Sequence, residues 1–295
     1  MKILPIFIFT LLLLTLYPIC SFSDNNICQN GDIKIVSESE GVIDMKDLID
    51  EISDKKIIYI GEFHDNSLHH KIQLGIVKKL WNKNHRLALG MEMFQSRFQD
   101  IINKYLKGNM DEDEFLEKTG YKDRWGFDYS LYKPIIDFCK KNRIPVIALD
   151  IDSELIKKVS ARGISSLSSS ELDELPKYID FTNKNYEKLL YNVFKEHPRV
   201  PDSNFKKFYS SQLVRDEEMA ENIDKFFKAN PEYQIVILTG NGHIMYSYGT
   251  PSRAFRRNKL DYVTIANDLD YKPSIADYII NTNKCEIKKS KEPAL

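Results

Sequence analysis

Short apolar, β-branched runs alternate with helical patterns along most of this chain, and that alternation constrains its fold more than any other feature. Strands are predicted at 33–36, 56–60, 86–93, 145–149, 234–239 and 262–266, and 275–280 is the last readable element. Helices are predicted at 45–52, 67–83, 95–107, 111–118, 129–141 and 204–229, with a further helical stretch through Arg257. Because strands that alternate with helices favour parallel pairing, the pattern predicts an α/β fold, a mainly parallel sheet with helices on both faces.

A single large domain fits the length and composition. With 295 residues, of which 42% are hydrophobic, the chain has enough apolar surface for one full core. The segment from about 154 to 201 is polar, helical in pattern and without a strand signal. We therefore expect one α/β domain over 24–295 that carries a helical insertion or lid at about 154–201.

The first 23 residues have the pattern of a secretory signal peptide. Lys2 is their only charge, a long apolar run follows it, and small polar residues lead up to Ser23, where cleavage is expected. The prediction is an exported protein of the periplasm or cell envelope. Cys20 leaves open a lipoprotein alternative, in which its acylated thiol anchors the mature chain, although Ile19 suits such processing poorly.

Cysteine and charge content limit the partners. An exported chain can form disulfides, and a bridge between Cys28 and Cys285 would tie the two ends together. In the other interpretation all the thiols are unpaired, and Cys139 is a small buried apolar residue. The formal net charge is −1 with both signs scattered along the chain, so nothing predicts a nucleic-acid partner.

Two strand runs end in the same motif, Gly-x-x-His. The first is YIGEFH, which ends at His64 and also carries Glu62, and the second is ILTGNGH, which ends at His243. A third run, GMEMF, carries Glu92 between apolar neighbours, where a carboxylate is costly to bury without a partner. Since ligands of open α/β sheets bind outside the carboxyl ends of the strands, we expect these four side chains to share one site.

Two predicted helices add polar residues to that site. In the helix at 204–229, Gln212, Arg215 and Asp216 lie along the face that its apolar residues mark as buried. Arg215 is expected either to neutralise a buried carboxylate such as Glu92 or Glu62, or to act directly in the chemistry. In the helix at 67–83, His70 begins an apolar face. All four are predicted to border the site as supporting residues.

The residue types leave several uses of this cluster open. His64, His243 and Glu92 could hold a divalent metal such as zinc, manganese, cobalt or iron. With Glu62, they could instead act as acid/base residues on an organic ligand. A pair of satisfied core histidines is the structural alternative.

Haem is a further interpretation, drawn from the segment HIMYSYGTPSRAFRR that begins at His243. Its tyrosines Tyr246 and Tyr248 could ligate iron, and Arg253 could pair with a propionate. Tyr209 is a third candidate ligand because of its predicted position near the site. The alternative is an ordinary turn followed by a basic helix with solvated arginines.

Five motifs in order resemble one family. They are GEFHDNSLHHKIQ, GMEMF, WGFDYSLYKPIIDFCKKNRIPVIALD, QLVRDEEMA and TGNGHIMYSYGTPSRAFRR. Together they make the chain, from about Asp32 to Ile280, similar to the ChaN-like haem-binding uptake proteins. That family shares a superfamily with Tiki proteases, TraB proteins and erythromycin-esterase-like enzymes, whose paired Gly-x-x-His motifs and glutamate match His64, His243 and Glu92.

The resemblance implies a function and a rival to it. It implies an exported protein that binds haem through tyrosine, serves haem or iron acquisition, forms a homodimer and works with an outer-membrane haem or iron receptor. From the Tiki branch it implies instead a metal-dependent hydrolase, a peptidase or esterase, in which His64, His243 and Glu92 are metal or acid/base residues and Glu62 assists.

Overall fold

Eight strands form one central sheet in the computed structural model, which describes residues 33–195 and 201–282. The strands are β1 (Lys34–Ser37), β2 (Gly41–Ile43), β3 (Ile57–Glu62), β4 (Leu87–Gln95), β5 (Val146–Asp150), β6 (Gln234–Gly240), β7 (Tyr262–Asn267) and β8 (Tyr278–Asn281). Their order across the sheet is β2-β1-β8-β7-β3-β6-β4-β5. Strands β3 to β8 pair in parallel, and β1 pairs antiparallel with both β8 and β2. The mainly parallel sheet predicted from the sequence is confirmed.

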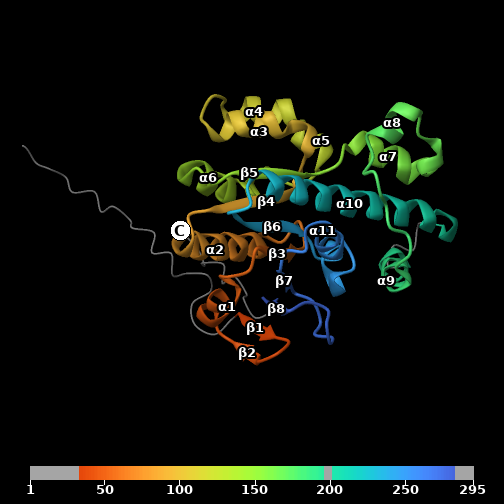
Figure 1. Cartoon of the computed structure of the whole chain (residues 1–295). Coiled ribbons are helices and arrows are strands. Elements are labelled where there is room, and N and C mark those ends of the chain that lie inside the picture. Colours follow the sequence, from red (N-terminus) through yellow and green to blue (C-terminus); the bar gives the residue numbers. More distant parts are fainter. Residues whose placement is uncertain (1–32, 196–200, 283–295) are drawn as a thin grey trace, which may run out of the picture.

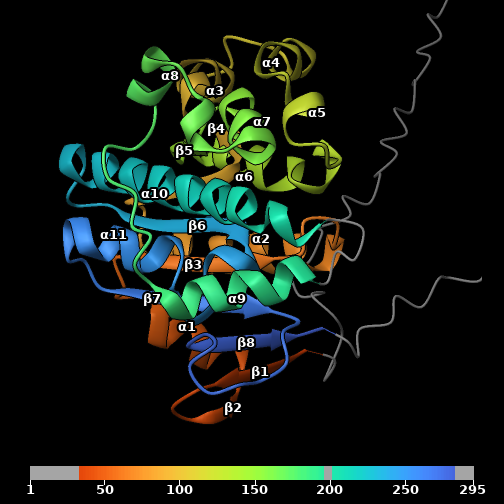
Figure 2. The same cartoon turned by 90° about the vertical axis from the view of Figure 1, so that its right-hand side faces the viewer.

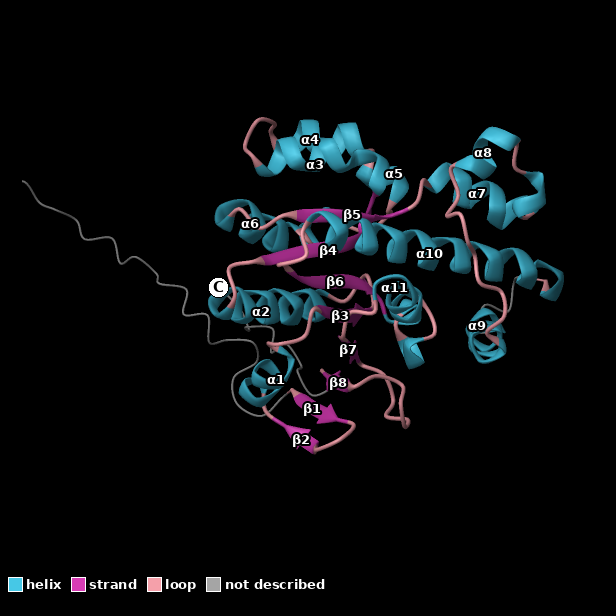
Figure 3. Cartoon of the chain, viewed as in Figure 1, coloured by secondary structure: helices cyan, strands magenta, loops and turns pink. Residues whose placement is uncertain are grey.

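Helices cover both faces of this sheet, so the strands lie in a middle layer (Figure 3). On one face the core is built with side chains from α1 (Met45–Ile52), α2 (Ser67–Lys83), α3 (Gln99–Leu106), α4 (Glu112–Thr119), the short α5 (Tyr121–Arg124) and α6 (Lys133–Asn142). On the other face, α10 (Phe205–Ala229) and α11 (Thr250–Asn258) lie side by side (Figures 1 and 2). The prediction of an α/β fold with two helical layers therefore holds.

Local chemistry explains why several predicted boundaries match the observed ones. Helix α2 begins after Asn66, whose side chain accepts hydrogen bonds from the backbone N–H groups of Leu68 and His69. Helix α1 begins after Asp44, whose carboxylate accepts from Asp47 N–H. Such caps satisfy N–H groups that have no partner inside the helix. Strand β3 has isoleucine at three of its six positions and is buried along its whole length, as a strand in the middle of a covered parallel sheet should be.

The segment predicted as an insertion is helical where the structure describes it. It forms α7 (Ser153–Arg162), α8 (Ser169–Asp173) and α9 (Lys184–Lys195), with no strand between 153 and 195. Helix α9 reaches the site through Tyr186, whose hydroxyl donates to Asp216 of α10 at 2.7 Å. Whether the segment acts as a lid stays a prediction.

Several features of the fold differ from the sequence-based expectation. The helix expected from residue 95 begins at Gln99, because β4 runs on to Gln95. Strand β2 was not predicted, because three residues are too short for a readable pattern and Val42 is exposed. It forms because β1 offers a free antiparallel edge. The element expected at 275–280 contributes its strand only from Tyr278 onward.

Other predictions concern residues outside the described ranges. The signal peptide at 1–23, Cys20, Cys28 and Cys285 all lie there. Cys139 is inside, as a buried free cysteine of α6 whose thiol pKa burial raises to about 12. In the described part of the chain, every helix is too short or too polar to cross a bilayer.

Candidate functional site

The two Gly-x-x-His motifs lie at the carboxyl ends of two adjacent strands, β3 and β6. In the parallel pairing of β3 with β6, Gly61 is opposite Thr239 and Glu62 is opposite Gly240. Strand β4 flanks β6 on the other side and carries Glu92 beyond the last paired residues of that ladder. The structure therefore brings together the strand ends that the sequence singled out.

Each motif's glycine makes room for a side chain of the other motif. A Cβ on Gly61 would lie 2.2 Å from Asn241 Oδ1, and a Cβ on Gly240 would lie 3.0 Å from His64 Cε1 and 3.1 Å from its Nε2. Contacts below 3 Å are not tolerated by real side chains, and 3.0–3.4 Å is tight. The glycines are thus required for the two motifs to approach each other.

Glu62 orients His64. Its Oε1 accepts hydrogen bonds from His64 Nδ1 at 2.8 Å and from the Tyr132 hydroxyl at 2.6 Å, and its Oε2 accepts from Gln73 Nε2 at 2.7 Å. Burial by itself would raise the pKa of Glu62, but hydrogen bonds from His64 and His70 lower it overall. Glu62 is therefore ionised, and its oxygen at Nδ1 favours the tautomer of His64 that carries a proton there. This leaves Nε2 as the acceptor that faces Gly240.

His70 is a buried supporting group on α2. Its Nε2 donates to the backbone carbonyl of His64 at 3.1 Å, and its Nδ1 faces Gln73 Oε1 at 3.1 Å and Glu62 Oε2 at 3.4 Å. Both ring nitrogens meet acceptors, which favours the imidazolium form. Burial lowers the pKa of His70, but the hydrogen bond and charge of Glu62 raise it overall.

Glu92 is fully enclosed by donors. Its Oε2 accepts from the Thr239 hydroxyl at 2.6 Å and from Gly240 N–H at 2.7 Å, and its Oε1 accepts from Arg215 Nη2 at 2.7 Å. His243 Nε2 lies 3.4 Å from the same Oε1. Burial would raise the pKa of Glu92, yet the charges of His243 and Arg215 hold it well below its usual range.

Arg215 joins Glu92 to a carboxylate that the sequence reasoning did not name, Asp150 at the end of β5. Its Nε lies 3.1 Å from both oxygens of Asp150, and its Nη2 lies 2.6 Å from Oδ2. The expectation that Arg215 neutralises a buried carboxylate is met for Glu92. Burial raises the pKa of Asp150 in spite of Arg215, and the two carboxylates raise that of the guanidinium.

His243 lies between two carboxylates. Its Nδ1 is 2.8 Å from Asp216 Oδ1, which also accepts from the Thr250 hydroxyl at 2.9 Å, and its Nε2 faces Glu92. Burial lowers the pKa of His243, but Glu92 and Asp216 raise it overall to about 10. Burial would raise the pKa of Asp216, whereas the charge of His243 lowers it. His243 is therefore a buried cation, with neither ring nitrogen free for a ligand.

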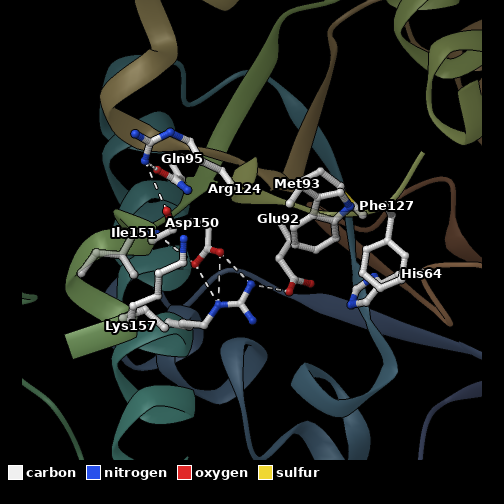
Figure 4. A pocket seen from close by; sticks show the side chains of 13 residues that line it. His64, Glu92, Met93, Gln95, Arg124, Phe127, Asp150, Ile151 and Lys157 are labelled. Carbon is white, nitrogen blue, oxygen red and sulfur yellow. Dashed lines mark hydrogen bonds and ion pairs between the residues drawn. The ribbon is translucent and has the colours of Figure 1, made fainter. Parts of the chain in front are cut away.

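A pocket of about 310 Å³ opens beside this cluster at the ends of β4 and β5. Figure 4 shows His64 at one end, Lys157 at the other, and Glu92 and Asp150 between them. Trp125 and Phe127 pack against the His64 ring, with centroids 4.7 Å and 5.0 Å away. The side chain of His64 remains 25% exposed, so a small molecule in the pocket can reach it.

The donor set does not suit the metal expected at His64, His243 and Glu92. Within residues 33–195 and 201–282, no group of three or more His, Cys, Asp or Glu side chains is arranged to hold a metal ion. The oxygens of Glu92 are occupied by four donors, and the Arg215 guanidinium supplies the positive charge that a metal would. In the described part of the chain the cluster is an ion-pair network, and its residues do not fit a metal ion.

The residues expected to contact haem lie apart from this pocket. Tyr246 and Tyr248 stack on each other, with ring centroids 5.4 Å apart, in the turn between β6 and α11. The Tyr209 hydroxyl is buried without a hydrogen-bond partner among the described residues. Arg253 is buried, and its Nε lies 3.1 Å from Glu217 Oε1. Its charge is already paired.

Sequence reasoning missed several groups around the site and placed one too near. Asp150 closes the strand VIALD, so the strand-end rule that identified Glu62 and Glu92 would have found it. Tyr132 and Lys157 carry no such local signal, because neither of them stands at the end of a strand. Gln212, predicted as a supporting residue, is half-buried on α10 and does not line the pocket.

Known proteins resemble this chain in sequence and fold. Residues 48–254, more than half of the chain, match the family described as "Haem-binding uptake, Tiki superfamily, ChaN". A solved structure described as cofacial heme binding to ChaN of Campylobacter jejuni superposes with a TM-score of 0.69 and 18% identity, covering 85% of this chain and 97% of that one. A more distant structure, of an erythromycin esterase mutant, has a TM-score of 0.46 and 15% identity, covering 80% of this chain and 78% of that one.

A curated relative shares a shorter stretch. Protein RETICULATA-RELATED 5, chloroplastic, from Arabidopsis thaliana is 27% identical over 135 residues, which make up 43% of this chain and 18% of that protein. The chain therefore spans less than a fifth of the length of this relative.

Proposed function

The chain belongs to the ChaN family of haem-binding uptake proteins in the Tiki superfamily, and from that premise we propose that it binds haem at the turn that carries Tyr246 and Tyr248. One observation carries the choice of this turn. Tyr246 and Ser247 both have left-handed backbone conformations, with φ of 54° and 56°. Such strain costs about 1–3 kcal/mol per residue and collects at functional sites.

The two tyrosines suit a haem ligand. Both rings are half-buried, and neither hydroxyl has a hydrogen bond within the described residues. A tyrosine oxygen is one of the protein groups that hold haem iron. Tyr248 also packs against Tyr186 of α9, with centroids 6.3 Å apart, which gives the turn an aromatic flank. Haem bound at this turn would offer its iron to a tyrosine oxygen and its flat apolar face to the aromatic rings.

The histidine and the arginines of the same segment are less suitable haem contacts. His243 has both ring nitrogens engaged, so it is not proposed as an iron ligand. Arg253 and its neighbours Arg256 and Arg257 pair with Glu217 of α10. We therefore do not assign the propionates to these arginines.

Haem titration followed by absorption spectroscopy tests the proposal. We expect saturable binding at a fixed stoichiometry with a tyrosinate-type spectrum. Tyr246→Phe or Tyr248→Phe should alter that spectrum. Tyr233→Phe is the matched control, because Tyr233 precedes β6 at the opposite end of the strand. Uptake without saturation, or a spectrum that neither variant changes, would contradict the proposal.

We further propose that the protein is exported and serves haem or iron acquisition, with a receptor in the outer membrane as a partner. Residues 1–23 support export by their signal-peptide pattern. Mass spectrometry of the protein recovered from a bacterial cell envelope tests this. A mature chain that starts at residue 24 is expected. An acylated Cys20 at the N-terminus would support the lipoprotein alternative, and a full-length chain in the cytoplasm would overturn both.

The Glu62–His64 pair favours a second candidate function, hydrolysis of a peptide or ester. A carboxylate holds Nδ1 of the histidine, and Nε2 faces a pocket, as a general base requires. In this scheme Nε2 takes a proton from water as the water oxygen attacks the carbonyl carbon. The same nitrogen then returns that proton to the leaving alkoxide or amine as the acyl C–O or C–N bond breaks. His64→Gln should then lower the rate on a small activated ester at least about 100-fold, while exposed His85→Gln leaves it unchanged. Equal rates in both variants would contradict the proposed hydrolase function.

A further inference from the structure

The pocket between His64 and Lys157 does not belong to the proposed haem site. Tyr246 and Tyr248 do not line it, and its volume of about 310 Å³ is at the low end of small-molecule pockets, which span roughly 300–1,000 Å³. A pocket of that size suits a single-ring molecule rather than a porphyrin. It therefore calls for a ligand of its own.

The charged groups that line the pocket determine whether it favours a positively or a negatively charged ligand. Glu92 and Asp150 share the Arg215 guanidinium, and His243 adds a second cation beside Glu92. Each of these two carboxylates therefore already faces a cation of the protein. Lys157, on the pocket side of α7, has no hydrogen bond or ion pair within the described residues. An anion can therefore reach an uncompensated positive charge.

Arginine groups reinforce the positive end of the pocket. Nη1 of Arg215 takes no part in the bonds to Glu92 and Asp150, which use Nε and Nη2. Arg124 also lines the pocket, and its Nη1 is held by Glu154 and Ser153. Carboxylates are preferred partners of such groups because charge-assisted hydrogen bonds are the strong ones.

The opposite end offers an acceptor. Glu62 accepts from His64 Nδ1, and in the tautomer with its proton on Nδ1 the ring offers Nε2 as an acceptor at the pocket surface. Between the two ends, the walls are apolar and partly aromatic, with Met93, Trp125, Phe127, Ile151 and Ile156. The pocket therefore favours a ligand with a flat apolar body, an anionic group at one end and a hydrogen-bond donor at the other.

We propose that this pocket binds a small organic carboxylate with a single-ring body, whose carboxylate lies at Lys157 and Arg215 and whose far end donates a hydrogen bond to His64 Nε2. The site is independent of haem binding and requires neither metal nor covalent chemistry.

Tryptophan fluorescence provides a direct readout. The chain has two tryptophans, of which Trp125 lines the pocket and Trp81 lies on α2, outside it. In a Trp81→Phe background, the emission of Trp125 reports occupancy. The probes are 4-hydroxyphenylacetate, its uncharged amide, and phenylacetate, which lacks the donor hydroxyl. The hydroxy acid is expected to saturate the signal and to bind more tightly than either analogue.

Two variants locate the ends of the ligand. Lys157→Gln should weaken binding of the acid about tenfold, which corresponds to about 1.4 kcal/mol, and should leave the amide unchanged. Lys158→Gln is the matched control, since Lys158 is the next residue but pairs with Glu171 outside the pocket. His64→Leu should abolish the preference for the hydroxy acid over phenylacetate. Equal unfolding midpoints in urea show that each variant is folded.

Three outcomes would overturn the proposal. They are the lack of saturable quenching up to about 10 mM probe, equal affinities for the acid and its amide, and equal effects of Lys157→Gln and Lys158→Gln. Tyr246→Phe should leave carboxylate binding intact even if it abolishes haem binding. Failure of the haem proposal is thereby distinguished from failure of this one.

Discussion

At the scale of single residues, the candidate site is a network of buried charges that neutralise one another. Glu62 faces His64 and His70, and Glu92 faces Arg215 and His243. A buried charge without a partner is costly, and removing one member of such a pair leaves the other exposed to that cost. His64 differs from the rest because one of its ring nitrogens stays open to the pocket. The network therefore holds His64 in place with its Nε2 free to act.

The glycines of the two motifs give a residue-scale prediction. Gly61→Ala should destabilise the protein by about 1–3 kcal/mol, the usual cost of overpacking, because its Cβ would lie 2.2 Å from Asn241 Oδ1. Gly240→Ala should cost less, since its Cβ meets the movable His64 ring, but should weaken ligand binding in the pocket. Urea unfolding measures the first effect and Trp125 fluorescence the second.

Gly242→Ala is the control within the same motif, because a Cβ there would meet nothing within 4 Å. It should change stability by only a few tenths of a kcal/mol. A Gly61→Ala protein as stable as Gly242→Ala would contradict the close approach of the two motifs.

The pKa of His243 predicts how stability depends on pH. That pKa is about 10 in the folded protein and about 6.5 in an unfolded chain. Because the folded-state pKa is raised, the stabilisation is complete below about pH 6.5 and is lost as pH rises toward 10. Urea unfolding between about pH 6 and pH 9 should show a loss on the order of a few kcal/mol.

The His243→Gln variant should be less stable at about pH 6 and should show a much flatter profile above it. His85→Gln, which changes an exposed histidine, should keep the wild-type slope. An unchanged slope in His243→Gln would assign the pH dependence to another group.

At the scale of elements, strand ends and helix starts place the chemistry. The carboxyl ends of strands β3, β4, β5 and β6 carry Glu62, Glu92, Asp150 and Gly240, in that order. Helix α10 passes these strand ends and adds Arg215 and Asp216. Consecutive residues of α10 serve different partners, since Arg215 points to β4 and β5 whereas Asp216 points to His243. One helix thereby links both halves of the network.

Strand β5 lies at the edge of the sheet and is shielded by a side chain. Gln99 Nε2 donates to Val146 carbonyl, and Gln99 Oε1 accepts from Ala148 N–H, both at 2.8 Å, as a neighbouring strand would. Unpaired edges invite aggregation. Gln99→Ala should therefore lower stability by about 1–2 kcal/mol and promote aggregation on heating.

Urea unfolding and light scattering test this prediction. Lys104→Ala, an exposed change on the same helix α3, is the control and should affect neither property. A Gln99→Ala protein that scatters no more than this control would show that the edge needs no such shield.

At the scale of the whole molecule, haem binding should control the oligomeric state. Haem held as proposed, by a half-buried tyrosine turn, would leave much of its flat apolar surface in water, and a second copy of the chain could cover that surface. Sedimentation velocity should therefore find a monomer without haem and a dimer with it. Tyr246→Phe, if it abolishes haem binding, should stay monomeric. A haem-loaded monomer would contradict the expected homodimer.

The sequence by itself determined the α/β class, most helix and strand positions, and the strand ends at which Glu62, His64, Glu92 and His243 meet. These follow from periodicity and from the rule on carboxyl ends of parallel strands, and both are readable from local pattern. Helix α2 illustrates this, because its cap and apolar stripe lie within its own residues.

Only the tertiary structure decided which partners the charged groups take. It pairs Arg215 with Asp150 as well as Glu92, turns Arg253 inward to Glu217, and brings Lys157 to face the same pocket as His64. These contacts join residues far apart in the chain, and they depend on strand register and on how helices cross the sheet. The pattern along the sequence records which residues are buried, but ångström-scale distances between segments decide whether a buried charge is a ligand, a base or one half of an ion pair.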